Sequence, residues 1–565
     1  MIKERQMTKI HHTITTVMML MLLALGLVFN APAVDAAVED APFADQFPAD
    51  TLLYASLRTD DAYIDLLDGI VERFVSVLQP LAQPGDLPPD LSLRTVLDMI
   101  AMDAVGSDFA SGVRPWLGDV VALGAAPDAD GMTQILLVVD VTNKDAVLSF
   151  LTANAPDLER TEEGDFTVFY DGFETYIAVN NDAMYITAER ALIPFNALDG
   201  SLATTSLFMD SLAALPAESY NILLYANGDG VAQAEAAASM FGAPDLESMA
   251  GDNVTLMVGA TIQDERSLIL DVVGLGEDAA MLFSAFDTPV DPAFTRYIPD
   301  ASMVIHGSNL ADTLMTALAA SGEDVSQFET ISQLFQLDFQ TEFLPLFSGD
   351  YALFLDVAGL DLISFLDSSA IDPDFIVAGV VLETTNYENV QAVLSNLNML
   401  LMMFASGEGI SVEPGTIAGT DALIITISDP SLVNPLEIVL AANEEVIVIV
   451  TRNVAESILS GEGGLDRSPL YQEAANYFLP NSSIVAYLEP GTLIGLASLG
   501  WSFAVNPTVE GVVLQSSGVT PGLGQTDDDM IQALNTLINQ FHSLTITTAV
   551  NGDVATARFV ITLSD

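Results

Sequence analysis

The sequence predicts an α+β fold, built as a tandem duplication of a unit of about 250 residues with antiparallel sheets of paired strands covered by helices. Three observations support this prediction. A turn motif containing proline occurs four times, and each copy runs into an apolar stretch. The order of segments in the first half returns in the second half at nearly constant spacing. Strands come in adjacent pairs with short connections, which favours antiparallel pairing.

The repeated motif is a large apolar residue, a proline, and a serine or threonine three positions after the proline. It occurs at Phe47–Thr51, Leu215–Ser219, Ile298–Ser302 and Leu479–Ser483. Proline fixes φ and donates no hydrogen bond, so it suits the position just before a strand. The polar residues after it hold a turn through local hydrogen bonds. The motif therefore starts strands and carries no chemistry of its own.

In the first half, apolar residues three and four apart predict helices, and short apolar runs predict strands. Helices are expected at residues 60–78, 93–102, 143–151, 192–198, 206–215 and 231–240. Strands are expected at residues 120–124, 135–141, 166–170, 176–179, 184–188, 254–261 and 267–273. Several strands are almost entirely apolar, so we expect cover on both faces of the sheet.

The second half repeats this order. Pro345–Asp350 matches Pro115–Asp119 with one inserted residue, and Asn443–Thr451 aligns without a gap on Asn180–Ala188. Further helices are expected at 310–320, 389–404 and 531–541, and strands at 375–382, 544–550 and 555–563. The matches predict a signal peptide at 1–36, a first α+β repeat at 37–286, a Pro-containing linker at 287–297 and a second α+β repeat at 298–565.

The N-terminus predicts the compartment. Lys3, Arg5 and Lys9 precede an apolar run at 13–29, and small residues follow at 31–36. This order is typical of a secretory signal peptide, and an uncleaved N-terminal anchor is the alternative. No other stretch of the sequence is apolar for long enough to span a membrane. We therefore expect a secreted or extracytoplasmic protein without an integral span after signal cleavage.

Charge and composition exclude several classes of function. The chain has 15 Lys and Arg against 78 Asp and Glu, a formal net charge of −63. A surface this acidic repels nucleic acid and anionic lipid headgroups. The acids are scattered, which favours solubility over cation binding as their role. Cysteine is absent, so disulfides, thiol catalysis and thiolate metal sites are excluded.

Motifs for catalysis are weak. Beyond the leader, histidine occurs at His306 and His542, and no G-x-S-x-G elbow accompanies them, so we expect both to be structural. Asp128–Gly131 contains part of a calcium loop but lacks its later ligands, which favours a hairpin turn. Gly461–Gly464 lacks the lysine of a phosphate loop and is interpreted as a connector. No catalytic, cofactor-binding or metal-binding residue and no cofactor is predicted.

The helix expected at 389–404 is the feature most suggestive of binding. Its C-terminal half extends the apolar surface well round the helix, through Met399, Leu400, Met402 and Met403. Methionine-rich helices can line adaptable apolar sites. A helix buried on both sides is the alternative. These four residues are the predicted lining of an apolar ligand site.

Three sequence patterns resemble a known family. They are Pro-x-x-Gly-Asp, the Gly-Gly-Leu-x-x-Ser-Pro-x-Tyr pattern at Gly463–Tyr471, and the Leu-Pro-x-x-Ser pattern at Leu479–Ser483. In this order they are similar to the secreted bacterial family known as domain of unknown function 3352. The first half departs from the second pattern, with Gly200-Ser201-Leu202. The resemblance implies an envelope or extracellular location, and it supplies neither an activity nor a catalytic residue.

Three functional hypotheses follow. The first is a secreted or envelope-associated non-catalytic protein that binds an apolar ligand or a protein partner. The second is an extracellular hydrolase that uses a carboxylate pair, which requires two acids in one cleft with perturbed pKa values. The third is a structural cell-surface protein with an exposed apolar patch. The sequence nominates no acidic pair, and we favour the first hypothesis.

Overall fold

The computed structural model describes residues 41–78, 91–128, 131–173, 175–217, 219–231, 254–263, 266–276, 287–321, 338–357, 372–404, 409–429, 432–492, 536 and 539–564. The chain divides into two compact units. The first comprises residues 1–282 with 552–556, and the second comprises 283–551 with 557–565. The predicted signal peptide lies outside the described residues, as do the helix expected at 231–240, except for its first residue, and most of that at 531–541.

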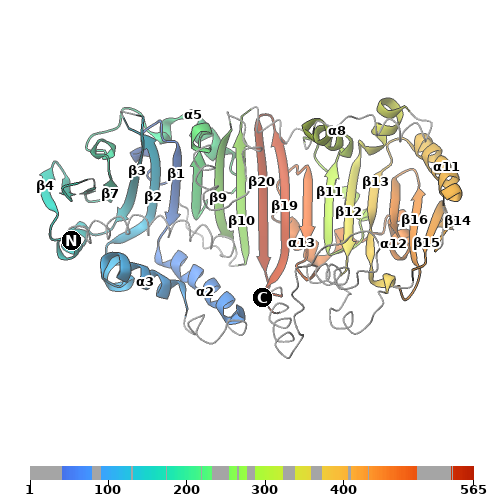
Figure 1. Ribbon diagram of the computed structural model, residues 1–565, viewed down its shortest axis with the longest axis horizontal. Helices are drawn as coiled ribbons and strands as arrows, with labels where there is room; N and C mark the ends of the chain where they lie inside the picture. The colour runs from blue at the N-terminus through green and yellow to red at the C-terminus, as the bar shows by residue number, and fades with distance from the viewer. Residues whose placement is uncertain are drawn as a thin grey trace, which may run out of the picture. The chain divides into compact units, whose positions relative to one another are not determined.

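The first unit forms an antiparallel sheet (Figure 1). Among its described residues, neighbouring strands follow the order β4, β5, β6, β7, β3, β2, β1, β8, β9, β10. Their bounds are β1 Leu53–Arg58, β2 Leu117–Pro127, β3 Thr133–Val141, β4 Glu159–Glu163, β5 Phe166–Tyr170, β6 Tyr176–Val179, β7 Ala183–Thr187, β8 Ile222–Ala226, β9 Thr255–Gln263 and β10 Ser267–Leu275.

Both faces of this sheet are covered, as the apolar strands predict. One face packs in a core that includes Phe47, Tyr54 and Phe208, with α5 (Ser206–Ala214). The other face packs under α2 (Asp61–Leu78), α3 (Leu93–Val105), the π-helical turn η3 (Phe109–Val113) and α4 (Lys144–Asn154). The short 3-10 helices are η2 Ala44–Gln46, η4 Arg190–Leu192 and η5 Leu202–Thr204.

The strands of the second unit follow an order that corresponds position by position: β14, β15, β16, β17, β13, β12, β11, β18, β19, β20. Their bounds are β11 Met303–Ser308, β12 Asp350–Asp356, β13 Val377–Glu383, β14 Ile410–Ile417, β15 Thr420–Ile427, β16 Leu436–Ala442, β17 Val446–Thr451, β18 Ile484–Leu488, β19 Phe541–Asn551 and β20 Val554–Leu563.

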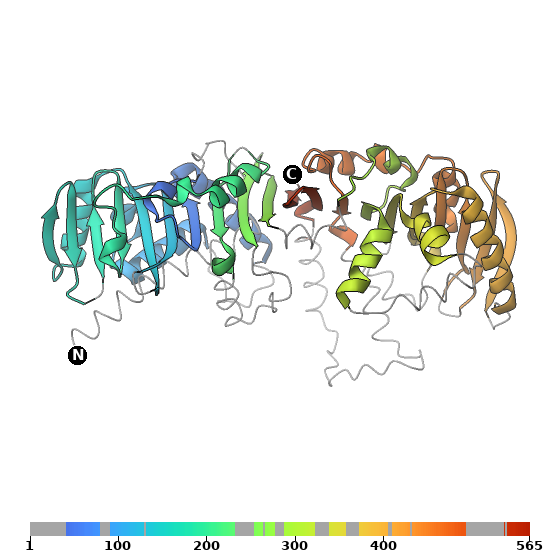
Figure 2. The same cartoon turned by 90° about the horizontal axis from the view of Figure 1, so that it is seen from above.

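Helices accompany the second sheet. They are η7 Pro292–Tyr297, α8 Leu310–Ser321, the π-helical turn η8 Phe339–Phe343, η9 Leu344–Phe347, η10 Pro373–Phe375, α11 Tyr387–Phe404, α12 Arg452–Leu459, η11 Leu465–Arg467 and α13 Pro469–Ala475. Residues 292–297 of the predicted linker form η7, whose Phe294 and Tyr297 are buried in the core of this unit. Figure 2 shows α11 beside the outer strands of this sheet.

The proline motif starts two neighbouring inner strands of each sheet. β1 and β8 follow the first two copies and pair with each other, and β11 and β18 follow the last two copies and do the same. In the first copy, the Thr51 hydroxyl donates a 2.7 Å hydrogen bond to the carbonyl of Pro48 and closes the turn. Local turn chemistry thus sets where these two inner strands of each sheet begin.

The Pro-x-x-Gly-Asp pattern has a physical explanation. The Asp119 N–H donates to the Asp140 carboxylate at 2.7 Å, and a Cβ on Gly118 would collide with that carboxylate. In the second unit the Asp350 N–H donates to the Glu383 carboxylate at 3.0 Å, beside Gly349. We call this arrangement the Gly-Asp clasp. It ties β2 to β3 and β12 to β13, and it requires glycine because the acid occupies the space of a side chain.

The predicted mixture of helices with antiparallel sheets is confirmed, and the sheets dominate. The helix expected at 192–198 was wrong: the chain forms η4 and then continues without a helix, because Pro194 has no N–H to extend it. The strands β4, β14, β15 and β16 were not anticipated. The expected turn at 128–131 is supported by the Gly131 N–H, which donates to the Asp128 carbonyl at 3.0 Å.

Candidate functional site

The outer part of the second sheet is longer than its counterpart in the first. β14 and β15 have 8 residues each and β16 has 7, whereas β4 and β5 have 5 each and β6 has 4. The helix that precedes these strands is also longer, with 18 residues in α11 against 11 in α4. In the second unit, these three strands and the helix are therefore all longer than their counterparts in the first unit.

The added strand length forms two apolar rows across the sheet. Register places Ile410 opposite Ile427 and Ile427 opposite Leu436, and it aligns Val412, Ile425 and Ile438 in the same way. Directly opposed residues share a face of the sheet. We call these six residues, Ile410, Val412, Ile425, Ile427, Leu436 and Ile438, the distal layer. Its rows contain no charged or polar side chain.

The opposite face of the same strand ends is polar, with Ser411, Thr426 and Glu437 in register. The alternation gives one apolar and one polar surface, as expected for a sheet with two different environments. Yet the apolar side is not buried: Ile410 is 46% exposed, the rest of the distal layer is half-buried, and Val433 in the following loop is 59% exposed. The distal layer is therefore exposed at its outer end, at Ile410, and partly accessible elsewhere.

Helix α11 lies over the same face of the sheet, because its N-terminal half packs through Val390, Val393 and Leu394 against Ala442 and Ile447. Its C-terminal half contains the four residues predicted to line an apolar site. Met399 is 54% exposed. The side chains of Leu400, Met402 and Met403 lie outside the described residues, so their role stays a prediction. The strand residues of the distal layer were missed, because register is needed to align them.

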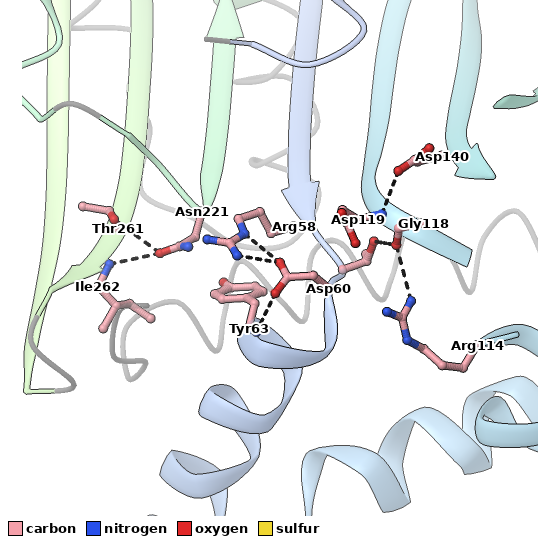
Figure 3. A network of polar contacts seen from close by, with 11 residues as sticks. Arg58, Asp60, Tyr63, Arg114, Gly118, Asp119, Asp140, Asn221, Thr261 and Ile262 are labelled. Carbon is pink, nitrogen blue, oxygen red and sulfur yellow. Dashed lines mark hydrogen bonds and ion pairs between the residues drawn. The ribbon is translucent and has the colours of Figure 1, made fainter. Parts of the chain in front are cut away.

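A second candidate is a polar network at the strand ends of the first unit (Figure 3). The buried Arg58 guanidinium donates to the Asp60 carboxylate at 2.7 Å and lies 5.8 Å from the centre of the Tyr63 ring. Asp60 in turn accepts the Tyr63 N–H at 3.0 Å and so begins α2. Nearby, Asn221 accepts hydrogen bonds from Thr261 and Ile262 at 3.3 and 3.1 Å.

Arg114 extends this network by donating to Asp61 and to the carbonyl of Leu117, at 2.7 and 2.9 Å. Its hydrogen bond lowers the pKa of the Asp61 carboxyl, and burial raises the pKa of the Tyr63 hydroxyl. Both arginines thus have acidic partners in the same unit, which leaves little positive charge for a ligand. The network fastens α2 to the sheet, and its role is structural.

The two histidines do not form a catalytic group with a nucleophile in the part of the chain that the structure describes. His306 is 1% exposed and lies 3.2 Å from the Asp350 carboxylate, which also accepts the Asp291 N–H at 2.6 Å. Its ring stacks on Phe294 with centroids 5.6 Å apart. The pair therefore holds η7 against β11. His542 lies 3.5 Å from Glu473.

Carboxyl groups gather at the other end of β11. Glu489 accepts a hydrogen bond from the Tyr487 hydroxyl at 2.9 Å, and Asp356 accepts one from Ser302 at 2.8 Å. Partial burial raises the pKa of the Glu489 carboxyl, and the charges of Asp300 and Asp356 raise it further. The hydrolase hypothesis needs an arrangement of this type. Here, however, each of the two carboxylates is held by a hydroxyl of its own unit.

The described residues contain no cluster of three or more acidic or histidine side chains that could hold a metal ion. No helix in that same part of the chain is both long and apolar enough to cross a membrane.

The fold and these surfaces define a class: an antiparallel α+β protein of two corresponding units, with a partly accessible apolar layer on the second. The chain belongs to the family described as "Protein of unknown function (DUF3352)", whose model matches residues 13–475. No curated protein matches the chain. One solved structure, titled "Structure of crystal form I of TP0453", matches at 9% identity and a TM-score of 0.20, covering 42% of this chain and 79% of that one. A TM-score this low carries no argument.

Proposed function

We propose that the protein is a secreted or envelope-associated, non-catalytic binding protein whose binding surface is the distal layer beside α11. The observation that carries this proposal is the partly exposed apolar surface that the longer strands form in the second unit. Ile410, Val433 and Met399 are about half exposed or more, and burying such side chains would stabilise a complex by roughly 25 cal/mol per Å² of apolar area. Exposed apolar patches commonly mark binding sites.

The location and the origin of the chain are part of the same proposal. The N-terminal sequence supports export, and the net charge of −63 supports a soluble surface in an open, salty environment. We propose that the two units arose by tandem duplication, which the corresponding strand orders support. A later extension of one copy would then have produced the distal layer.

The test uses Nile red, a neutral apolar dye, so that the acidic surface does not bias the result. We expect its emission to rise with the folded protein and to lose at least half of that rise in the double variant Ile410→Gln, Val433→Gln. Phe173→Gln is the matched control, because Phe173 is 51% exposed in the first unit. Equal losses in both variants, or no rise with the wild-type chain, would refute the proposal.

A further inference from the structure

The outer edge of the second sheet has backbone groups with no strand partner among the described residues. β14 pairs with β15 and, among the described residues, with no other strand. The Ser428 N–H donates to the Gly409 carbonyl at 2.7 Å, so this pair belongs to the hydrogen-bonded type. Pair types alternate along an antiparallel ladder. Ser411 and Glu413 therefore direct their backbone groups to β15, whereas Ile410, Val412 and Pro414 direct theirs outward.

Pro414 stands where its missing N–H costs β15 no hydrogen bond, as expected for a proline in an edge strand. Pro414 also ends any pairing with an added strand, because it has no N–H to donate outward. The corresponding edge strand of the first unit, β4, is protected differently: Glu159, Arg160, Glu162 and Glu163 are charged. Charged edges discourage strand addition. The segment 410–413 has one charge and a distal layer on its apolar face, so it lacks this protection.

We propose that β14 accepts an added strand from a protein partner, paired with the outward N–H and C=O groups of Ile410 and Val412. This rests on the proposed function of the distal layer and specifies its ligand. Partner residues opposite Ile410 and Val412 would share the apolar face and must be apolar. Those opposite Ser411 and Glu413 would share the polar face, where Glu413 and Glu437 favour lysine or arginine. The partner is an extended segment that alternates apolar and basic residues.

The test uses an eight-residue capped peptide that alternates valine and lysine, measured by fluorescence anisotropy at physiological ionic strength. Two comparison peptides are needed: a valine–glutamate version, and the lysine peptide with alternate backbone N-methylation. We expect the parent peptide to bind the full chain at least tenfold more tightly than either. Val412→Pro should weaken binding at least tenfold because it removes an outward N–H, whereas Val412→Ile, which keeps that N–H and the apolar side chain, should bind the peptide as the wild-type chain does. Circular dichroism checks that the proline variant folds.

Glu413→Lys provides an independent readout, because it changes a side chain and leaves the backbone hydrogen bonds to the added strand unchanged. It should reduce the preference for the lysine peptide over the glutamate peptide at least fivefold. If the N-methylated peptide binds as well as its parent, strand addition is refuted while the Nile red result can still stand. If the chain forms a dimer that Val412→Pro abolishes, a second copy occupies the edge and the proposal of a foreign partner fails.

Discussion

The first and second units share a scaffold but differ at the ends of their strands. Both contain the Gly-Asp clasp, and both begin a π-helical turn with an aspartate. Asp108 accepts from Ser111, and Asp338 accepts from Thr341, each through the backbone N–H and the hydroxyl. These hydrogen bonds lower the pKa of both carboxyls. The shared features are local devices that build the fold.

The differences lie in charge. Where the first unit has the ion pair of Arg58 and Asp60, the second unit has Ser308 at the position of Arg58, and Asn309 takes the place of Asp60 as the cap of the following helix. Where the second unit has Asp356 and Glu489, the first has Ala126 and Asn227. The two units therefore combine the same strand order with different charged side chains at these positions. Exchanging residues between corresponding positions tests which of these side chains each unit requires.

The largest expected effect comes from Arg58→Ser, which gives the first unit the residue of the second. It leaves Asp60 with its charge largely buried and unpaired, and breaking such a pair costs about 3–5 kcal/mol. The double variant Arg58→Ser, Asp60→Asn should recover most of that loss, because asparagine keeps the N-cap of α2 without the charge, as Asn309 does for α8 beside Ser308. Urea unfolding, with hydrogen exchange of residues 53–63, measures the stability of the single and of the double variant. A double variant as unstable as the single one would show that the exchange is not local.

The Gly-Asp clasp should give a smaller, graded effect. Gly118→Ala places a methyl group against the short Asp140 side chain and is expected to cost about 2–3 kcal/mol. Gly349→Ala meets the Glu383 carboxylate at 2.7 Å and the Glu383 Cβ at 2.9 Å. The overlap is milder than at Gly118 and the longer glutamate side chain can move its carboxylate, so we expect a cost of about 1 kcal/mol.

Gly69→Ala in α2 is the matched control, since a Cβ there meets nothing within 4 Å. It should stabilise the helix by about 0.5–1 kcal/mol. Thermal melts of the three variants rank them. If Gly349→Ala proves as costly as Gly118→Ala, the length of the acidic side chain does not decide the tolerance.

The sequence could predict the elements whose cause is local. The proline of each motif and the serine or threonine after it mark the starts of β1, β8, β11 and β18, because turn chemistry acts within a few residues. The role of Gly118 could not be read in this way, since the carboxylate it accommodates comes from another strand. β14 was missed because Pro414 and Gly415 lie inside it, and both normally indicate a turn.

The candidate site likewise has one part that the sequence could predict and one part that it could not. Met399 and its neighbours were found because a helix shows its apolar surface in its own periodicity. The distal layer is a property of three strands in register, and single-strand patterns do not reveal which rows align. The acids around Glu489 also come from three separate strands or turns. The sequence shows that these acids are present but not that they lie close together.

The smallest expected effect concerns Glu489 and is seen in its dependence on pH. The pKa of its carboxyl is raised in the folded chain, so folding favours the protonated form. Its contribution is therefore most favourable below the unfolded pKa and is lost as pH rises through the folded pKa. Glu489→Gln removes the charged form and keeps an acceptor for the Tyr487 hydroxyl. We expect the Tm to rise by about 1–2 °C at pH 7 and to be unchanged at pH 4.

Asn227→Asp is the control at the corresponding position of the first unit, where Ala126 stands in place of Asp356. Because fewer like charges surround it, its effect should change less between pH 7 and pH 4 than that of Glu489→Gln. Differential scanning calorimetry at both pH values compares the variants. A rise in Tm for Glu489→Gln that persists at pH 4 would mean that packing, rather than the titration of this carboxyl, separates the two units at this position.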